Sequence, residues 1–161
     1  MPAKPKDAPD VTPIATNRKA RYDYAIEESF ETGVVLTGSE VKSLREGKAS
    51  LADAYGMIRG GEVFLVGCHI PPYKQASMLN HEPLRMRKLL LHTSEIRRIA
   101  AKTAEKGYTL VPTRLYFKKN RVKVELALAK GKKHYDKRQT IATRDAEREM
   151  AKRRGTMRRG G

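Results

Sequence analysis

The chain contains one cysteine and no tryptophan. A single cysteine cannot form an intramolecular disulfide, which fits a reducing compartment. Cys68 lies in the apolar segment VFLVGCHI, so we expect a small core residue rather than a nucleophile. No run approaches the roughly 20 apolar residues that a membrane helix needs, and the first residues, MPAKPKDAPDVTPIAT, lack the apolar region of a signal peptide. We therefore expect a soluble, cytoplasmic protein.

Acidic residues are also scarce, with 18 Asp and Glu against 34 Lys and Arg, which gives a net charge of +16. The excess positive charges repel one another in a compact chain. Such an imbalance indicates a polyanionic partner, which would neutralise them. Nucleic acid is favoured over a membrane surface because no segment combines a strong apolar face with a basic one. RNA is favoured over duplex DNA because no helix-turn-helix or zinc-finger pattern is present.

Sequence patterns of known catalytic sites are absent. The four histidines are scattered, without zinc-type spacing or a partnering cysteine pair. Neither a glycine-rich phosphate loop nor a nucleophile elbow occurs. Asp53 and its few acidic neighbours form no visible cluster for a magnesium-dependent nuclease. We therefore expect a protein without enzymatic activity, cofactor or metal, and an RNA-processing enzyme remains the alternative from another class.

Hydrophobic periodicity predicts short antiparallel strands and two helices. The segment YDYAIEESFETGVVLTG alternates from Tyr22 onward and changes phase near residues 27–29, which indicates a long strand with a bulge. GSEVKSLR predicts a two-turn helix that Ser39 caps and Gly47 ends, and TSEIRRIAAKTAEKG predicts a longer one that begins at Thr93 or Ser94 and ends at Gly107. The other predicted strands are 51–58 and 63–70 around Gly60 and Gly61, LRMRKLLL, and two strands around Lys119 and Asn120.

These elements favour a mainly β protein built as a small closed antiparallel OB-like barrel of about six strands, with two or three flanking helices and a flexible C-terminal tail. Residues 1–16 are expected to form a disordered leader, because four prolines in the first thirteen residues oppose regular structure. The barrel is expected over residues 17–130 and the basic tail over residues 131–161.

The tail carries eleven Lys and Arg against four Asp and Glu and has few large apolar side chains. Residues 132–154 contain no glycine or proline, so their composition permits a helix. An isolated helix of this length is marginal in water. We expect a tail that is disordered when free and helical on a polyanion. A permanently disordered tail that binds RNA nonspecifically is the alternative.

The expected barrel would present many cations at its rim. They are Arg18, Lys19, Arg21, Lys42, Arg45, Arg85, Arg87, Lys88 and Lys123. Tyr22 and Tyr24 lie between basic residues, and their rings could stack on exposed bases. The alternative is that these tyrosines pack into the barrel and the cations form an ordinary solvated surface.

Three segments, NRKARYDYAIEESFETGVVLTGSEVKSLREGKASL, RKLLLH and AKGKKHYDKR, resemble the SsrA-binding protein (small protein B) family of bacterial trans-translation. The resemblance covers roughly residues 17–138. It implies an OB-like barrel that binds the tRNA-like domain of transfer-messenger RNA and takes the place of an anticodon arm in the small-subunit decoding centre of the 70S ribosome. It also implies a monomer that reaches stalled ribosomes together with elongation factor Tu, with its tail in the vacant mRNA channel. A general ribosome-associated OB protein is the nearest alternative.

The resemblance also assigns roles to individual residues. Asn17, Glu31 and Leu91 fall at positions tied to transfer-messenger RNA binding. Lys132 and Lys133 are expected at the junction of barrel and tail, on the side of RNA capture. The tail motif required on the ribosome corresponds to Asp136, Lys137 and Arg138. Tyr22 stands where the family often has histidine, and tyrosine can stack on a decoding-centre base but cannot become cationic near neutral pH.

Overall fold

A computed structural model describes residues 11–75, 80–132 and 148 of the chain. Seven strands and three helices lie between residues 11 and 132 of these ranges. In chain order they are β1 (Val11–Thr16), α1 (Ala20–Asp23), β2 (Tyr24–Val34), α2 (Gly38–Arg45), β3 (Tyr55–Arg59), β4 (Glu62–Val66), β5 (Arg87–Leu90), α3 (Thr93–Thr103), β6 (Tyr108–Lys118) and β7 (Arg121–Gly131).

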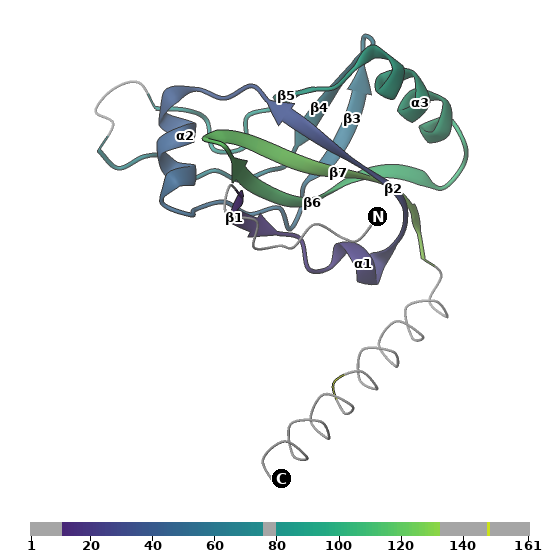
Figure 1. The fold of residues 1–161 in the computed structure, drawn as a ribbon, viewed down its shortest axis with the longest axis horizontal. Helices are drawn as coiled ribbons and strands as arrows, with labels where there is room; N and C mark the ends of the chain where they lie inside the picture. Colours follow the sequence, from purple (N-terminus) through teal and green to yellow (C-terminus); the bar gives the residue numbers. More distant parts are fainter. Residues whose placement is uncertain (1–10, 76–79, 133–147, 149–161) are drawn as a thin grey trace, which may run out of the picture.

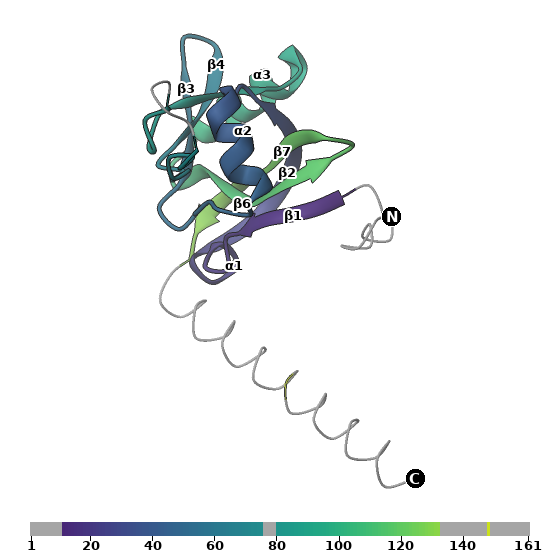
Figure 2. The same cartoon turned by 90° about the vertical axis from the view of Figure 1, so that its left-hand side faces the viewer.

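The sheet closes on itself (Figure 1). Six strands form a ring in the order β6-β3-β4-β5-β2-β7, and β7 pairs again with β6. Every pairing is antiparallel, and β1 adds to β6 as a seventh strand. The turned view shows α2 and α3 on the outside of this ring (Figure 2). The predicted OB-like barrel of about six strands with flanking helices is therefore confirmed.

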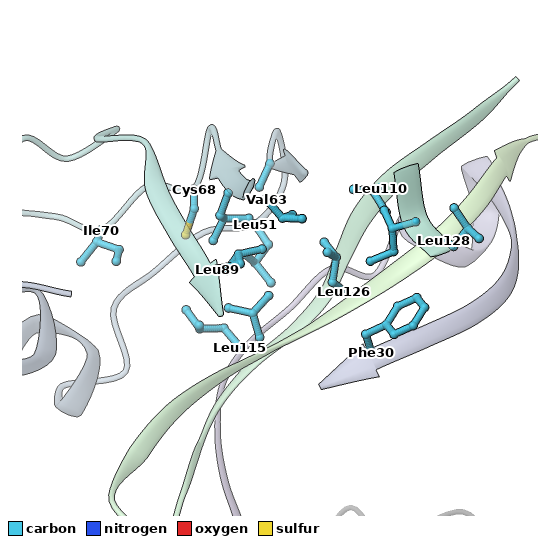
Figure 3. Packing of buried hydrophobic residues seen from close by; sticks show 14 of the residues in the cluster. Phe30, Leu51, Val63, Cys68, Ile70, Leu89, Leu110, Leu115, Leu126 and Leu128 are labelled. Atoms are coloured by element: carbon cyan, nitrogen blue, oxygen red, sulfur yellow. The ribbon is translucent and has the colours of Figure 1, made fainter. Parts of the chain in front are cut away.

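The barrel interior is filled by apolar side chains of the strands and of the loops, among them Leu51, Cys68 and Ile70 (Figure 3). Val124, Leu126 and Leu128 of β7 are at most 1% exposed, whereas Lys123 and Glu125 on the other side of the strand are only half-buried, and farther along that side the small Ala127 is buried. Such a two-residue period places one side of a strand in the core. Cys68 is fully buried among these residues, and burial raises the pKa of its thiol to about 11. The prediction of a core cysteine is confirmed.

Two tight turns lie where the sequence predicts them. Gly60 and Gly61 have φ angles of +59° and +76° between β3 and β4, and Lys119 and Asn120 have +50° and +65° between β6 and β7. Positive φ at both central residues is the geometry of the type I′ hairpin. The expected irregularity in β2 is also present, as a register shift between Ile26 and Glu28 against β7.

The ordered chain begins earlier than the sequence indicates. Residues 11–16 were expected to belong to a disordered leader, but they form β1 against the second half of β6. Pro13 lies beside a register shift at the edge of the sheet, where a missing amide donor is tolerated. Ile14 and Ala15 pack against the core, which outweighs the effect of the proline.

Three local predictions were wrong. Tyr22 was expected in a strand, but it lies in α1, a helix too short for its periodicity to show. The N-cap of α2 is Thr37 rather than Ser39, and that of α3 is His92 rather than Thr93 or Ser94. The Thr37 amide donates a 2.8 Å hydrogen bond to Glu40 Oε1, so a carboxylate three residues on satisfies the amide of the cap residue.

No helix within the described residues is long and apolar enough to cross a membrane. The predictions for residues 1–10, 133–147 and 149–161 lie outside the described residues.

Candidate RNA-binding surface

Asn17 connects β1 to α1 and fastens this connection to β6. Its amide donates to Thr113 O at 2.8 Å, and its side-chain Nδ2 donates to Pro112 O at 3.1 Å. Pro112 lies at the register shift of β6 against β7, where the ladder leaves a carbonyl for another donor. Asn17 therefore positions the segment that carries the exposed Arg18 and Lys19.

The chain leaves the barrel beside α1 (Figure 1). The Lys132 amide donates to Asp23 O at 2.9 Å, and Lys132 Nζ donates to Arg21 O at 2.7 Å. An ammonium group at the last carbonyls of a helix is favoured by the helix dipole. We call residues 17–24 together with Lys132 the α1 end. The structure brings the predicted Asn17, Arg18, Lys19, Tyr22, Tyr24 and Lys132 together there.

Glu31 lies on the outer surface of β2 and accepts hydrogen bonds from two residues of β6. Tyr116 Oη donates to Glu31 Oε2 at 2.5 Å, and Lys118 Nζ donates to Glu31 Oε1 at 3.1 Å. Partial burial raises the pKa of the Glu31 carboxyl, but these hydrogen bonds and the charges of Lys118 and Lys123 outweigh it and lower the pKa below its ordinary value. Glu31 is therefore an ionised carboxylate.

A second carboxylate, Glu125, lies directly across from Glu31 on β7. Like charges in this position repel each other unless cations compensate them. Arg114 Nε lies 2.6 Å from Glu125 Oε2, and the Arg114 guanidinium stacks 4.7 Å above the Tyr116 ring. The predicted Glu31 and Lys123 are thus neighbours in one network of alternating charges on β2, β6 and β7.

A buried ion network holds α2 on the barrel. The Glu40 carboxylate is fully buried and accepts from Arg85 Nη2 at 2.6 Å and from Arg87 Nε. Burial acts to raise the pKa of Glu40, but the hydrogen bonds from Arg85, the Thr37 amide and Arg87 outweigh it and lower the pKa to about 2. Arg87 was expected at the rim, and this was wrong. Its side chain is 0% exposed and donates from Nη1 to Cys68 O at 2.8 Å.

The opposite side of α2 presents the predicted Lys42 and Arg45 to solvent. Ser43 Oγ donates to Pro71 O at 2.7 Å, so this helix is fastened by polar contacts along its inner side. Lys42 Nζ lies 5.6 Å from the centroid of the Tyr73 ring, which is cation–π range. The buried side of α2 therefore fixes the direction of its exposed cations.

The last two predicted residues lie in and just after β5. Lys88 Nζ pairs with Glu62 Oε1 at 2.8 Å, so a phosphate would have to displace a carboxylate there. Leu91 packs against the hydrophobic core, whereas the preceding Leu90 is 51% exposed. In the structure Leu91 is a packing residue.

The predicted residues within the described ranges thus lie in four places: the α1 end, the outer surface of β2 and β7 with Glu31 and Lys123, α2 with Lys42 and Arg45, and β5 and its end with Lys88 and Leu91. Lys133, Asp136, Lys137 and Arg138 lie outside the described residues. Within the described ranges, His, Cys, Asp and Glu form no group of three that could hold a metal ion.

Sequence reasoning missed Glu40 and Tyr116. For Glu40 a signal was present, because TGSE has the spacing of a capping box. For Tyr116 no local signal exists, since its partner Glu31 is 85 positions away in the sequence.

Comparison with known families identifies the chain. The family model described as SmpB protein matches residues 14–156. The chain belongs to the SmpB family. It is 62% identical over 144 residues to an SsrA-binding protein of Symbiobacterium thermophilum, which covers 89% of this chain and 91% of that protein. It is 57% identical over 137 residues to the SsrA-binding protein of Halothermothrix orenii, with 85% and 88% covered.

A solved structure of an SmpB relative shares the fold. It is described as "tmRNA-SmpB: a journey to the center of the bacterial ribosome" and is 46% identical to this chain. The TM-score is 0.64, and the match covers 76% of this chain and 87% of the other. The relative is therefore similar in sequence as well as in fold.

Proposed function

We propose that this chain is an RNA-binding adaptor without enzymatic activity. It binds the tRNA-like domain of transfer-messenger RNA and delivers it to stalled ribosomes for trans-translation. Elongation factor Tu takes part in the delivery complex, and the chain acts as a cytoplasmic monomer. Its basic tail, from Gly131 onward, senses the empty mRNA channel below the decoding centre. The observation that carries the proposal is membership of the SmpB family over residues 14–156.

The described geometry supports RNA binding at more than one place. The backbone that carries the exposed cations is held in place. Lys42 and Arg45 project from α2, which a buried ion network fixes to the barrel. Arg18 and Lys19 follow Asn17, which two hydrogen bonds hold to β6. Cations in fixed positions contact phosphates with little loss of conformational entropy, so these groups fit a structured RNA better than a nonspecific polyanion.

The first experiment compares the affinity of the full chain for transfer-messenger RNA and for an RNA duplex of equal length, at several salt concentrations. We expect tighter binding to transfer-messenger RNA at every salt concentration. The slope of log K against log salt is about −0.7 to −0.9 per neutralised phosphate, so the measured slope gives the number of phosphate contacts. Equal affinity for both RNAs would contradict the proposal and favour a general ribosome-associated protein.

The second experiment tests the tail. A chain that lacks residues 136–161, and so keeps Lys132 and Lys133, should keep most of its affinity for transfer-messenger RNA and lose peptide tagging on stalled ribosomes. A collapse of affinity would instead place the tail in the RNA-capture surface.

A triple variant, Asp136→Ala, Lys137→Ala and Arg138→Ala, tests the tail motif in the full-length chain. We expect it to lose tagging and to retain RNA affinity. The control carries Glu149→Ala, Lys152→Ala and Arg153→Ala, which changes the net charge equally and lies farther along the tail. Equal tagging by both triple variants would rule out a specific role for the motif.

Catalysis is tested separately. Purified chain incubated with transfer-messenger RNA and magnesium should leave the RNA intact over hours. Cleavage that copurifies with the chain would revive the RNA-processing alternative.

A further inference from the structure

A hollow of about 260 Å³ lies between the α1 end, the loop before β3 and the first half of β6. Its size is slightly below the roughly 300 Å³ at which typical small-ligand pockets begin. One base with part of its ribose fits such a volume better than a pair of stacked bases. The polar and aromatic groups that line it are Asn17, Lys19, Asp23, Tyr24, Asp53, Tyr55 and Thr109.

The walls of the hollow are fixed by the barrel. Gly67 has a φ of +77°, and a Cβ at this position would lie 2.6 Å from Asp53 O, so only glycine permits the close contact that holds the loop. The Ala54 amide donates to Leu51 O at 3.0 Å within the same loop. On the opposite side, Tyr24 packs against the small cluster of Ala20, Val111 and Ala129. The site therefore exists before any ligand arrives.

Three of the lining groups are available to a ligand. Among the described residues, no hydrogen-bond or ion-pair partner is found for the Asp53 carboxylate or for the hydroxyl groups of Tyr24 and Tyr55. Tyr55 is 46% exposed, which is unusual for a large aromatic side chain at the start of a barrel strand. Within one rigid hollow the structure thus provides the carboxylates of Asp23 and Asp53, a lysine and two aromatic rings, and the carboxylate of Asp53 is the one available to a ligand.

We propose that this hollow binds a single guanine base of an RNA. A carboxylate accepts two hydrogen bonds from the N1–H and N2–H groups of guanine. The ammonium group of Lys19 can donate to the guanine O6 or N7 acceptor, a common protein contact to this base. Tyr24 and Tyr55 supply aromatic surface for stacking. Arg18 and Arg21 of the α1 end stand near the hollow for the adjoining phosphates.

The other bases fit these groups less well. Adenine presents an acceptor at N1, which a carboxylate repels, and uracil has one N–H group between two carbonyls. Cytosine donates only from its amino group. The inference rests on the proposed RNA-binding function, because the base is delivered as part of an RNA, but its failure would leave binding of transfer-messenger RNA intact.

The test uses the ¹⁵N-labelled full chain titrated with four probes: the tetranucleotides UGUU, UIUU and UAUU, in which I is inosine, and free GMP. We expect UGUU to bind at least tenfold more tightly than UAUU and to shift the amide resonances of residues 52–55 and 109–111. UIUU should lie between them, because inosine lacks the 2-amino group. Equal affinity for UGUU and UAUU would overturn the proposal.

Free GMP distinguishes the two sources of a guanine base. GMP should bind more weakly than UGUU, since it lacks the flanking phosphates. If GMP binds as tightly as UGUU, the site is one for a free nucleotide, and the RNA assignment is wrong.

Asp53→Asn should reduce the preference for UGUU over UAUU to less than about twofold, because the amide keeps only one acceptor oxygen and its NH2 group faces a guanine N–H that also donates. Glu82→Gln removes an exposed carboxylate elsewhere and is the matched control, which should keep the full preference. Transfer-messenger RNA affinity is measured in parallel on all three chains. If Asp53→Asn keeps the preference for UGUU over UAUU, the proposed contact is wrong. If the wild-type chain does not bind transfer-messenger RNA more tightly than the duplex, the proposed function is wrong instead.

Discussion

The Tyr116 hydroxyl donates a 2.5 Å hydrogen bond to Glu31 Oε2, and the two residues stand on strands that are not adjacent in the ring. Tyr116 is only 3% exposed. Burial, followed by the hydrogen bond to Glu31, raises the pKa of the Tyr116 phenol well above its ordinary value. The phenol therefore remains a donor at any physiological pH, and Glu31 remains ionised beside it. Glu31 is a fixed acceptor in the network of alternating charges on β2, β6 and β7.

Tyr116→Phe should raise the pKa of Glu31, because the substitution removes the largest of the interactions that lower it. The measurement is an NMR pH titration of the Glu31 side-chain carboxyl carbon. Tyr108→Phe is the matched control, since Tyr108 Oη donates to Glu27 Oε1 at 2.6 Å in an exposed pair. The control should leave Glu31 unchanged. An identical Glu31 titration in wild type and Tyr116→Phe would contradict the assigned hydrogen bond.

Glu40→Gln should change how stability depends on pH. The carboxyl has a pKa of about 2 in the folded chain against 4.5 as its ordinary value. Between these pH values the unfolded chain binds the proton and the folded chain does not, so stability falls as pH falls through this window. The shift corresponds to about 3 kcal/mol that is present above pH 4.5 and lost by pH 2.

Urea unfolding from pH 6 to pH 2 measures this effect. Glu40→Gln should lower stability at pH 6 by about 3 kcal/mol or more, because Arg87 is left buried without its counter-charge. Its stability should also depend less on pH than that of wild type. Glu62→Gln, which breaks the exposed pair with Lys88, is the control and should run nearly parallel to wild type. If the free energy of unfolding of Glu40→Gln also depends on pH as that of wild type does, the pKa of Glu40 is not lowered in the folded chain.

Arg45→Gln should make the salt dependence of transfer-messenger RNA binding shallower by about 0.7 to 0.9, the value of one lost phosphate contact. Lys48→Gln is the comparison, because Lys48 Nζ already pairs with Glu46 Oε2 at 3.2 Å. It should change the slope by much less. Fluorescence anisotropy at several salt concentrations measures both, and equal slopes for the two variants would remove α2 from the RNA-binding surface.

Leu91→Ala should lower the free energy of unfolding by about 2 kcal/mol, the low end for a leucine that packs against a core. Leu90→Ala should change it by less than about 0.5 kcal/mol, because Leu90 is 51% exposed. Thermal or urea unfolding distinguishes the adjacent residues. If RNA affinity measured well below the unfolding temperature falls for Leu91→Ala but stability does not, then Leu91 contacts the RNA and the packing interpretation is wrong.

The barrel was largely predictable because its signals are local. Two kinds of signal depend only on residues close in sequence. They are the alternation around Val124 and Leu126, and the turn residues Gly60, Gly61, Lys119 and Asn120. The wrong predictions concern elements whose stability depends on contacts between distant parts of the chain. A strand such as β1, with a proline, is stabilised by packing of Ile14 and Ala15 against the core, which composition does not show.

The candidate site was predictable only as a set of charges. Exposed cations such as Arg18, Lys42 and Arg45 follow from the composition, but Arg87 has the same chemistry and is buried. What separates them is the position of Glu40, which only the folded chain brings to Arg87. The hollow beside Asp53 depends likewise on three segments that are distant in sequence.

The N-terminal strand also affects self-association. β3 pairs with β6 only at Leu110, and β1 pairs with β6 at residues 114–118, so β1 covers backbone groups that would otherwise be unpaired. An open strand edge is a template for pairing with another chain. Removing residues 1–16 would therefore expose such a template, and truncated chains should aggregate or dimerise edge to edge. Pro13, which offers no amide donor, makes β1 itself a poor template for further growth of the sheet.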